Sequence, residues 1–146
     1  LVVYVADTYN HRIRAIVVAT GAVTTLAGSG SQGYTDNTGT AARFTRPYGV
    51  AVSPDGLVVY VADTYNHRIR AIVVATGAVT TLAGSGSAGF ADGTGAAASF
   101  YSPKGVAVSP DGLVLYVADD DNQRIRTIVV ATGAVTTLAG SGSGGF

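Results

Sequence analysis

Polar residues that could carry chemistry recur along the sequence at one fixed spacing. In each copy an aspartate is followed by an asparagine three residues later and by an arginine two residues after that. The nine residues are Asp7, Asn10, Arg12, Asp63, Asn66, Arg68, Asp119, Asn122 and Arg124. They could present a ring of charge to a ligand, but Asp and Asn side chains also cap backbone groups in turns, and a nearby arginine can hold an aspartate through two hydrogen bonds. We therefore interpret them as a structural turn set.

Two histidines, His11 and His67, occupy equivalent positions in the first two copies, and Gln123 takes that position in the third. A general base needs a positioned partner and a shifted pKa, and nothing in the sequence supplies either at a unique position. The histidines also lack the helical or hairpin spacing of zinc ligands, and the chain contains no cysteine. The sequence thus predicts no catalytic residue, no metal site and no cofactor.

Two further motifs invite a ligand. The acidic run 119–122 offers oxygen atoms to a hard cation, but it lacks the rest of a calcium-loop pattern, so a solvated turn is favoured. The glycine-rich stretch 28–40 lacks the lysine and the following helix of a phosphate-binding loop. We expect this stretch to be a packing loop.

Aromatic residues and residues that vary between the copies are the candidates for contact with a partner. Exposed tyrosines favour interfaces because they bury a large area at a small entropic cost, although they could equally pack under a neighbouring loop. The candidate interaction face comprises Tyr9, His11, Tyr34, Arg46, Tyr48, Tyr65, His67, Phe90, Lys104, Asp120 and Asp121.

The elements that position these residues follow from an internal repeat. The segment that starts at Leu1 returns unchanged from Leu57 and with a few substitutions from Leu113, which gives a period of 56 residues. In the complete unit we expect strands at 49–53, 57–62, 68–74 and 78–83, joined by turns rich in Pro, Asp and Gly. Four antiparallel strands make one blade of a β-propeller. The sequence therefore predicts an all-β fold of four-stranded blades, an incomplete propeller segment of about 2.6 blades.

The units divide the chain into a partial blade at 1–34, which holds strands two to four and the start of a loop, and two blades at 35–90 and 91–146. A long loop at 84–102 is expected to pack on a neighbouring blade. We expect one helical turn at 97–100, and one at the equivalent 41–44 a period earlier, to place Phe100 and Phe44 in the seams. The turn set and the long loops should lie at one end of the blades. The two short hairpins should lie at the other.

Composition excludes some partners. Nine basic residues balance nine acidic ones, so no global field favours nucleic acid. No apolar run of about eighteen residues is present, so we expect no membrane insertion.

At these same residues the chain resembles the NHL-repeat family. The resemblance lies in YVADTYNHRIR at 4–14 and 60–70, in TxLAGSGSxG, in GTxAxF and in PxGVAVSPDG. The family takes its name from an Asn-His-Leu triplet, whose third position is arginine here, Arg12 and Arg68. The resemblance implies a six-bladed propeller that binds proteins or RNA. A minority of related propellers are lyases or hydrolases.

Nearly identical blades repeat the same groups, whereas an active site needs different residues at one point. We therefore expect a non-enzymatic binding or scaffold module that contacts proteins or further copies of itself, in an extracellular or cell-surface protein. The alternatives are a structural unit of a repetitive filament, and a propeller lyase or hydrolase whose active site lies outside this segment. Neither end looks like a natural terminus. We expect more blades or oligomerisation to complete the propeller, because fewer than three complete blades cannot close into a ring.

Overall fold

The computed structural model describes residues 1–144, which form three antiparallel sheets in chain order. The first sheet contains β1 (Val2–Asp7), β2 (Arg12–Val17) and β3 (Ala22–Ala27). The second contains β4 (Pro47–Val52), β5 (Val58–Asp63), β6 (Arg68–Val73) and β7 (Val79–Ala83). The third contains β9 (Pro103–Val108), β10 (Val114–Asp119), β11 (Arg124–Val129) and β12 (Ala134–Ala139), and the two-residue β8 (Gly93–Thr94) runs along β12. The predicted all-β fold of four-stranded units is confirmed.

Short 3-10 turns complete the secondary structure. They are η1 (Thr8–Asn10), η2 (Gly39–Ala41), η3 (Thr64–Asn66), η4 (Gly95–Ala97) and η5 (Asp120–Asn122). None of the helices in residues 1–144 has the length and the apolar character needed to cross a membrane.

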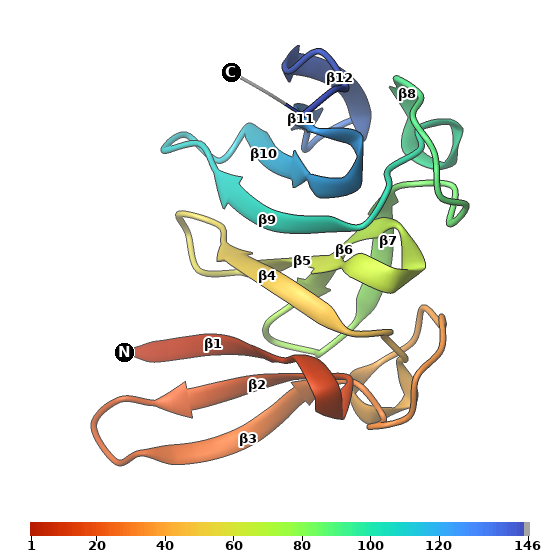
Figure 1. Ribbon diagram of the computed structural model, residues 1–146. Helices are drawn as coiled ribbons and strands as arrows, with labels where there is room; N and C mark the ends of the chain where they lie inside the picture. Colours follow the sequence, from red (N-terminus) through yellow and green to blue (C-terminus); the bar gives the residue numbers. More distant parts are fainter. Residues whose placement is uncertain (145–146) are drawn as a thin grey trace.

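The three sheets stack side by side, with β4 lying between β1 and β9 (Figure 1). Gly49 marks how close two of these inner strands come, because a Cβ atom at this position would collide with the carbonyl oxygen of Lys104. Each sheet twists away from this line of inner strands, which is the arrangement of successive propeller blades (Figure 1).

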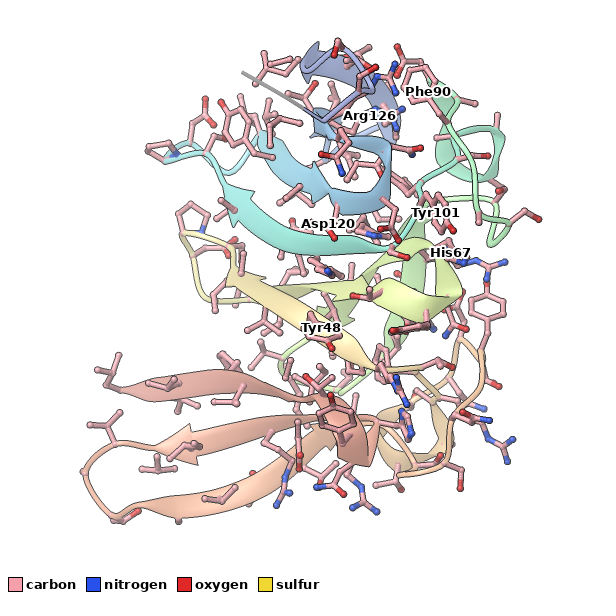
Figure 2. All side chains as sticks on the ribbon, viewed as in Figure 1. Tyr48, His67, Phe90, Tyr101, Asp120 and Arg126 are labelled. Carbon is pink, nitrogen blue, oxygen red and sulfur yellow. The ribbon has the colours of Figure 1, made fainter. Side chains whose placement is uncertain are left out.

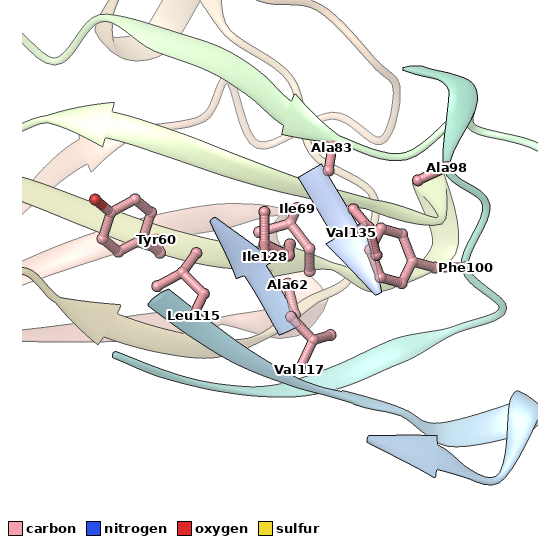
Figure 3. Packing of buried hydrophobic residues seen from close by; sticks show 10 residues of the cluster. All are labelled: Tyr60, Ala62, Ile69, Ala83, Ala98, Phe100, Leu115, Val117, Ile128 and Val135. Carbon is pink, nitrogen blue, oxygen red and sulfur yellow. The ribbon is translucent and has the colours of Figure 1, made fainter. Parts of the chain in front are cut away.

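Two hydrophobic seams hold the sheets together. In the first, Val59 and Val61 of β5 pack with Ile13 and Phe44. In the second, Tyr60 and Ala62, on the other side of β5, contribute to a cluster with Leu115, Val117 and Phe100 (Figure 3). Successive residues of a strand point to opposite sides, so a strand that is apolar at every position can serve both seams.

Phe44 and Phe100 have no exposed surface, in agreement with the seam positions predicted for them. The helical turns themselves lie slightly earlier than predicted, at η2 and η4, and the chain is already extended when it reaches each phenylalanine. The inner strand also begins earlier, at Pro47 rather than at residue 49.

The outer faces of the first and third sheets expose residues whose equivalents are buried in the seams. Val3 is 44% exposed, whereas its equivalent Val59 has no exposed surface. Ile125 is 41% exposed, whereas its equivalent Ile69 is fully buried. The outer face of the first sheet thus exposes the equivalents of residues that β5 buries in the first seam. The outer face of the third sheet exposes the equivalents of residues that the second sheet buries in the second seam.

Each long loop crosses to the outer edge of the following sheet. Gly93 and Thr94 of β8 pair with Val135 and Ala134 of β12. Thr38 makes the equivalent bridge to Ala78, beside β7. The loop therefore covers the outermost strand and carries its own side chains onto the next sheet.

Candidate interaction face

The turns η1, η3 and η5 lie at one end of the sheets, together with the segments that lead into the inner strands, 45–48 and 101–104. The β4–β5 and β9–β10 hairpins lie at the opposite end (Figure 1). Backbone hydrogen bonds join the two parts of this end, since the N–H of Tyr65 donates to Thr45 and that of Asp121 donates to Tyr101. We call this end the turn face.

The turn set is built around its aspartates. Asn66 Nδ2 donates to Asp63 at 2.8 Å, and the Thr45 backbone N–H donates to the other carboxylate oxygen, also at 2.8 Å. In the third sheet, Asn122 donates to Asp119 at the same distance. Each carboxylate therefore ties its own turn to the segment that leads into the inner strand. This is a structural use of the residue.

The arginine that pairs with the aspartate is not the expected one. Arg68 lies opposite Asp63 in the strand register, yet its guanidinium donates to the carbonyl oxygen of Ser85 at 2.9 Å. Arg70, two residues further along the strand, binds Asp63 at 2.7 Å instead. Arg68 also stacks on Tyr34, with its Cζ atom 3.7 Å from the ring centroid. The first sheet makes the same choice without a stacked ring, since Arg12 donates to Ser29 and Arg14 binds Asp7.

Arg70 is fully buried, and each of its N–H groups is used. It donates to Asp63, to Asp36 through two nitrogens, and to the carbonyl oxygens of Thr35 and Arg43. A buried charge is tolerated when it is paired and hydrogen-bonded in this way. In the third sheet Arg126 makes the equivalent bonds to Asp119 and Asp92, except that its Nε atom has no partner.

The aspartates that reach across from the long loops were missed in the sequence. Asp36 and Asp92 recur with the same 56-residue spacing as the turn set, and so do Arg70 and Arg126. That recurrence was the available signal. The sequence does not show that these residues pair, because each aspartate lies 34 residues from its arginine.

Tyr34 and Phe90 lie apart from the other aromatic candidates. Each stacks on an arginine of the following sheet, Tyr34 on Arg68 and Phe90 on Arg124, with Cζ atoms 3.7 and 3.9 Å from the ring centroids. Phe90 lies beside Arg126 at the far side of the third sheet (Figure 2). Of the two roles considered for these residues, the contacts match packing under a loop, and each ring stays about half exposed.

Four of the candidates meet at the first seam of the turn face. The guanidinium of Arg46 lies over the ring of Tyr9 at 5.4 Å and over that of Tyr65 at 5.1 Å. Tyr48 lies beside them, and its interaction with Tyr9 raises the pKa of its hydroxyl. His11 holds the backbone of Arg46 in place, because its Nδ1 atom accepts the Arg46 backbone N–H at 3.1 Å. We call Tyr9, Arg46, Tyr48 and Tyr65 the Arg46 cluster.

The remaining candidates lie at the second seam. Lys104 binds Asp120 at 2.6 Å, and this hydrogen bond raises the pKa of the lysine. His67 Nδ1 accepts the Ser102 backbone N–H at 3.1 Å, and burial lowers the pKa of the histidine. Tyr101, which was not among the candidates, meets the His67 ring edge-on at 5.7 Å (Figure 2).

Asp121 completes the second seam. It stands where Tyr65 stands in the second sheet, and its side chain is exposed. The two seams therefore present different chemistry on the same backbone, because the first is aromatic and cationic whereas the second carries a neutralised ion pair and a free carboxylate.

Within residues 1–144 no group of three or more His, Cys, Asp or Glu side chains is arranged to hold a metal ion. The turn face offers polar and aromatic contact surface, and its histidines each use one ring nitrogen to join neighbouring sheets.

Comparison with known proteins agrees with the repeat. The model of the NHL repeat matches residues 44–72 and 100–128. The chain is 38% identical over 133 residues to Protein SUPPRESSOR OF QUENCHING 1, chloroplastic, from Arabidopsis thaliana, covering 86% of this chain and 12% of that protein. It is 34% identical over 148 residues to NHL repeat-containing protein 2 from Bos taurus, covering 92% of this chain and 20% of that protein.

Among solved structures, a protein of unknown function from Bacteroides thetaiotaomicron VPI-5482 is similar with a TM-score of 0.78 and 25% identity, over 92% of this chain and 32% of that one. The chain thus spans 12% to 20% of the length of the two curated relatives. The two matches to the repeat model begin at Phe44 and Phe100, the residues that fill the seams, and end in β6 and β11. Because the repeat model fits at both positions and the Bos taurus relative is named for the same repeat, this chain belongs to the NHL-repeat family.

Proposed function

We propose that this chain is a non-enzymatic binding module that contacts protein partners through its turn face. NHL-repeat propellers are generally protein-interaction scaffolds. The observation that carries the proposal is the exposure of tyrosines on hydrogen-bonded turns, with Tyr9 at 73% and Tyr65 at 50%. Rigid, exposed tyrosines bury a large area with little loss of side-chain entropy when a partner docks.

The opposite end lacks such a group. Its hairpins expose Leu57 and Leu113, which are the same residue at equivalent positions. Asp55 and Asp111 close these turns by accepting the hydroxyl of Ser53 and of Ser109 at 2.5 Å. This end repeats one simple surface, whereas the turn face varies from seam to seam.

A binding role also fits the state of the polar side chains. A catalytic base must have a free nitrogen or oxygen near a nucleophile. Each histidine accepts a backbone N–H of the next sheet at Nδ1, which puts the proton of the neutral ring on Nε2 and leaves no nitrogen to take up a substrate proton, and Lys104 is bound to Asp120. The histidines thus join neighbouring sheets, and the lysine is paired within the third sheet, which supports binding over catalysis.

The proposal extends to the outer faces of the first and third sheets. They expose the two halves of a seam, as Val3 and Ile125 illustrate. Exposed apolar sheet faces of this kind associate with a complementary surface. We infer that further blades cover them, supplied by the same chain or by another copy.

The turn face is tested by selecting binders from a displayed peptide library on the immobilised protein. We expect selected peptides to lose binding to Tyr9→Ala and to Tyr65→Ala while they keep it to the matched controls Leu57→Ala and Leu113→Ala. Selected peptides that depend on the leucines and not on the tyrosines would overturn the proposal, and so would a selection that yields no binder.

A further inference from the structure

The Arg46 cluster contains a cation without an acceptor. Of the nine lysine and arginine side chains, seven donate to a carboxylate or a backbone carbonyl. Among the described residues, neither Arg43 nor Arg46 has a carboxylate within ion-pair distance or a hydrogen bond from its guanidinium. Arg46 differs from Arg43 in that two aromatic rings hold it.

Several independent contacts fix the position of Arg46. Its backbone adopts the left-handed conformation, with φ of 49°, which is uncommon for a residue with a side chain. The bond from its N–H to His11 keeps the backbone in place. Tyr9 comes from the first sheet and Tyr65 from the second, so the guanidinium bridges the seam.

The equivalent position at the second seam does not repeat this arrangement. Ser102 replaces Arg46 and is 8% exposed. Asp121 replaces Tyr65, and Lys104 replaces Tyr48 but is already neutralised by Asp120. Within a chain that otherwise copies itself, the free guanidinium is therefore confined to one seam.

We propose that the Arg46 cluster is a recognition site for a carboxylate of an acidic peptide segment in a protein partner. This inference rests on the proposed function and names the chemistry of the partner. A guanidinium has a planar fork of donors that matches the two oxygens of a carboxylate. The guanidinium lies over the rings of Tyr9 and Tyr65, and Tyr48 is hydrogen-bonded to Tyr9 beside them, so exposed aromatic surface is available for the neighbouring residues of the peptide.

The test uses the whole chain and three fluorescein-labelled probes in low salt, followed by anisotropy. The probes are a ten-residue peptide of glutamate and glycine, the same peptide with glutamine for glutamate, and a ten-nucleotide oligouridylate. We expect the glutamate peptide to bind, and we expect Arg46→Gln to weaken it about tenfold, the lower range for a hydrogen bond to a charged group because the site is exposed.

Arg43→Gln is the matched control, since Arg43 is also exposed and unpaired but lies away from the rings. It should leave the affinity unchanged, and the glutamine peptide should bind about tenfold more weakly than the glutamate peptide. Both variants should unfold at the temperature of the parent protein.

The inference is wrong if the glutamate peptide does not bind, if Arg43→Gln weakens it as much as Arg46→Gln, or if the oligouridylate binds more tightly with the same dependence on Arg46. In each case the library-selected peptides separate the two claims. If they still require Tyr9 and Tyr65, the turn face stands and acidic recognition falls. If they do not, both fall.

Discussion

Replacing Asp63 with asparagine removes one charge from an ion pair that is sealed from solvent. The side chains of Asp63 and Arg70 have no exposed surface, and their atoms lie 2.7 Å apart. Removing one partner of a buried pair costs about 3–5 kcal/mol, because the other charge is left without full compensation. Asp36 still binds Arg70 in the variant, so we expect a loss of about 3 kcal/mol, the lower end of that range.

The chain contains a matched control for this change. Asp7 occupies the equivalent position in the first sheet and binds Arg14 at 3.1 Å, but these side chains are 25% and 28% exposed. Exposed pairs contribute less than about 1 kcal/mol. Asp7→Asn should therefore cost less than about 1 kcal/mol, although the substitution and the asparagine bond within the turn are the same.

Urea unfolding followed by circular dichroism measures both losses as changes in the free energy of unfolding. At about 3 °C per kcal/mol for a domain of this size, the midpoint of thermal unfolding should fall by about 9 °C for Asp63→Asn and by less than about 3 °C for Asp7→Asn. Equal losses at the two positions would refute the reasoning. They would mean that the turn hydrogen bonds, and not the burial of the ion pair, supply the free energy.

Three further changes test other joints. Gly86→Ala should cost about 1–3 kcal/mol in urea unfolding, because its φ is +91° and a Cβ atom would collide with the Arg68 guanidinium; Gly21→Ala, with φ of +69° and open space around it, should cost less. Phe44→Ala should cost about 3–5 kcal/mol, because it empties the first seam, and a loss below about 1 kcal/mol would contradict the packing. Burial lowers the pKa of His67, so the unfolded chain takes up its proton first, and stability should fall as the pH drops below about 6.5. His67→Gln should reduce that dependence, and an unchanged slope between pH 7.5 and pH 5 would exclude this histidine as its source.

The repeat and its turn residues were sufficient to predict the strands. The strand predicted at 57–62 is β5 at Val58–Asp63, and the one predicted at 68–74 is β6 at Arg68–Val73. The inner strand was placed two residues late, because Pro47 and Tyr48 carry no alternation that marks a strand, whereas contact with β5 and β9 extends it. Tertiary packing decides such strand ends, and a single sequence does not contain that information.

The site was harder to predict than the fold. Local spacing identified the aspartates and asparagines, because their contacts lie within one turn. It assigned the wrong arginine, because Arg68 reaches the carbonyl oxygen of Ser85, 17 residues along the chain, and local spacing does not show this contact. It also grouped Tyr34 with the turn-face tyrosines, since exposure alone does not show which part of the surface a ring covers.

The long loops link each repeat to the next, because each loop contacts the sheet that follows it. Each loop places an aspartate, an aromatic ring and a backbone pairing on the sheet that follows, as Asp92, Phe90 and β8 do on the third sheet. At both junctions the loop of one repeat thus makes equivalent contacts with the sheet of the next, whereas the exposed residues of the turn face differ. A gene that duplicates or loses one whole period would keep these loop contacts at the junction that it creates, so the number of blades can change in evolution while the contacts are preserved.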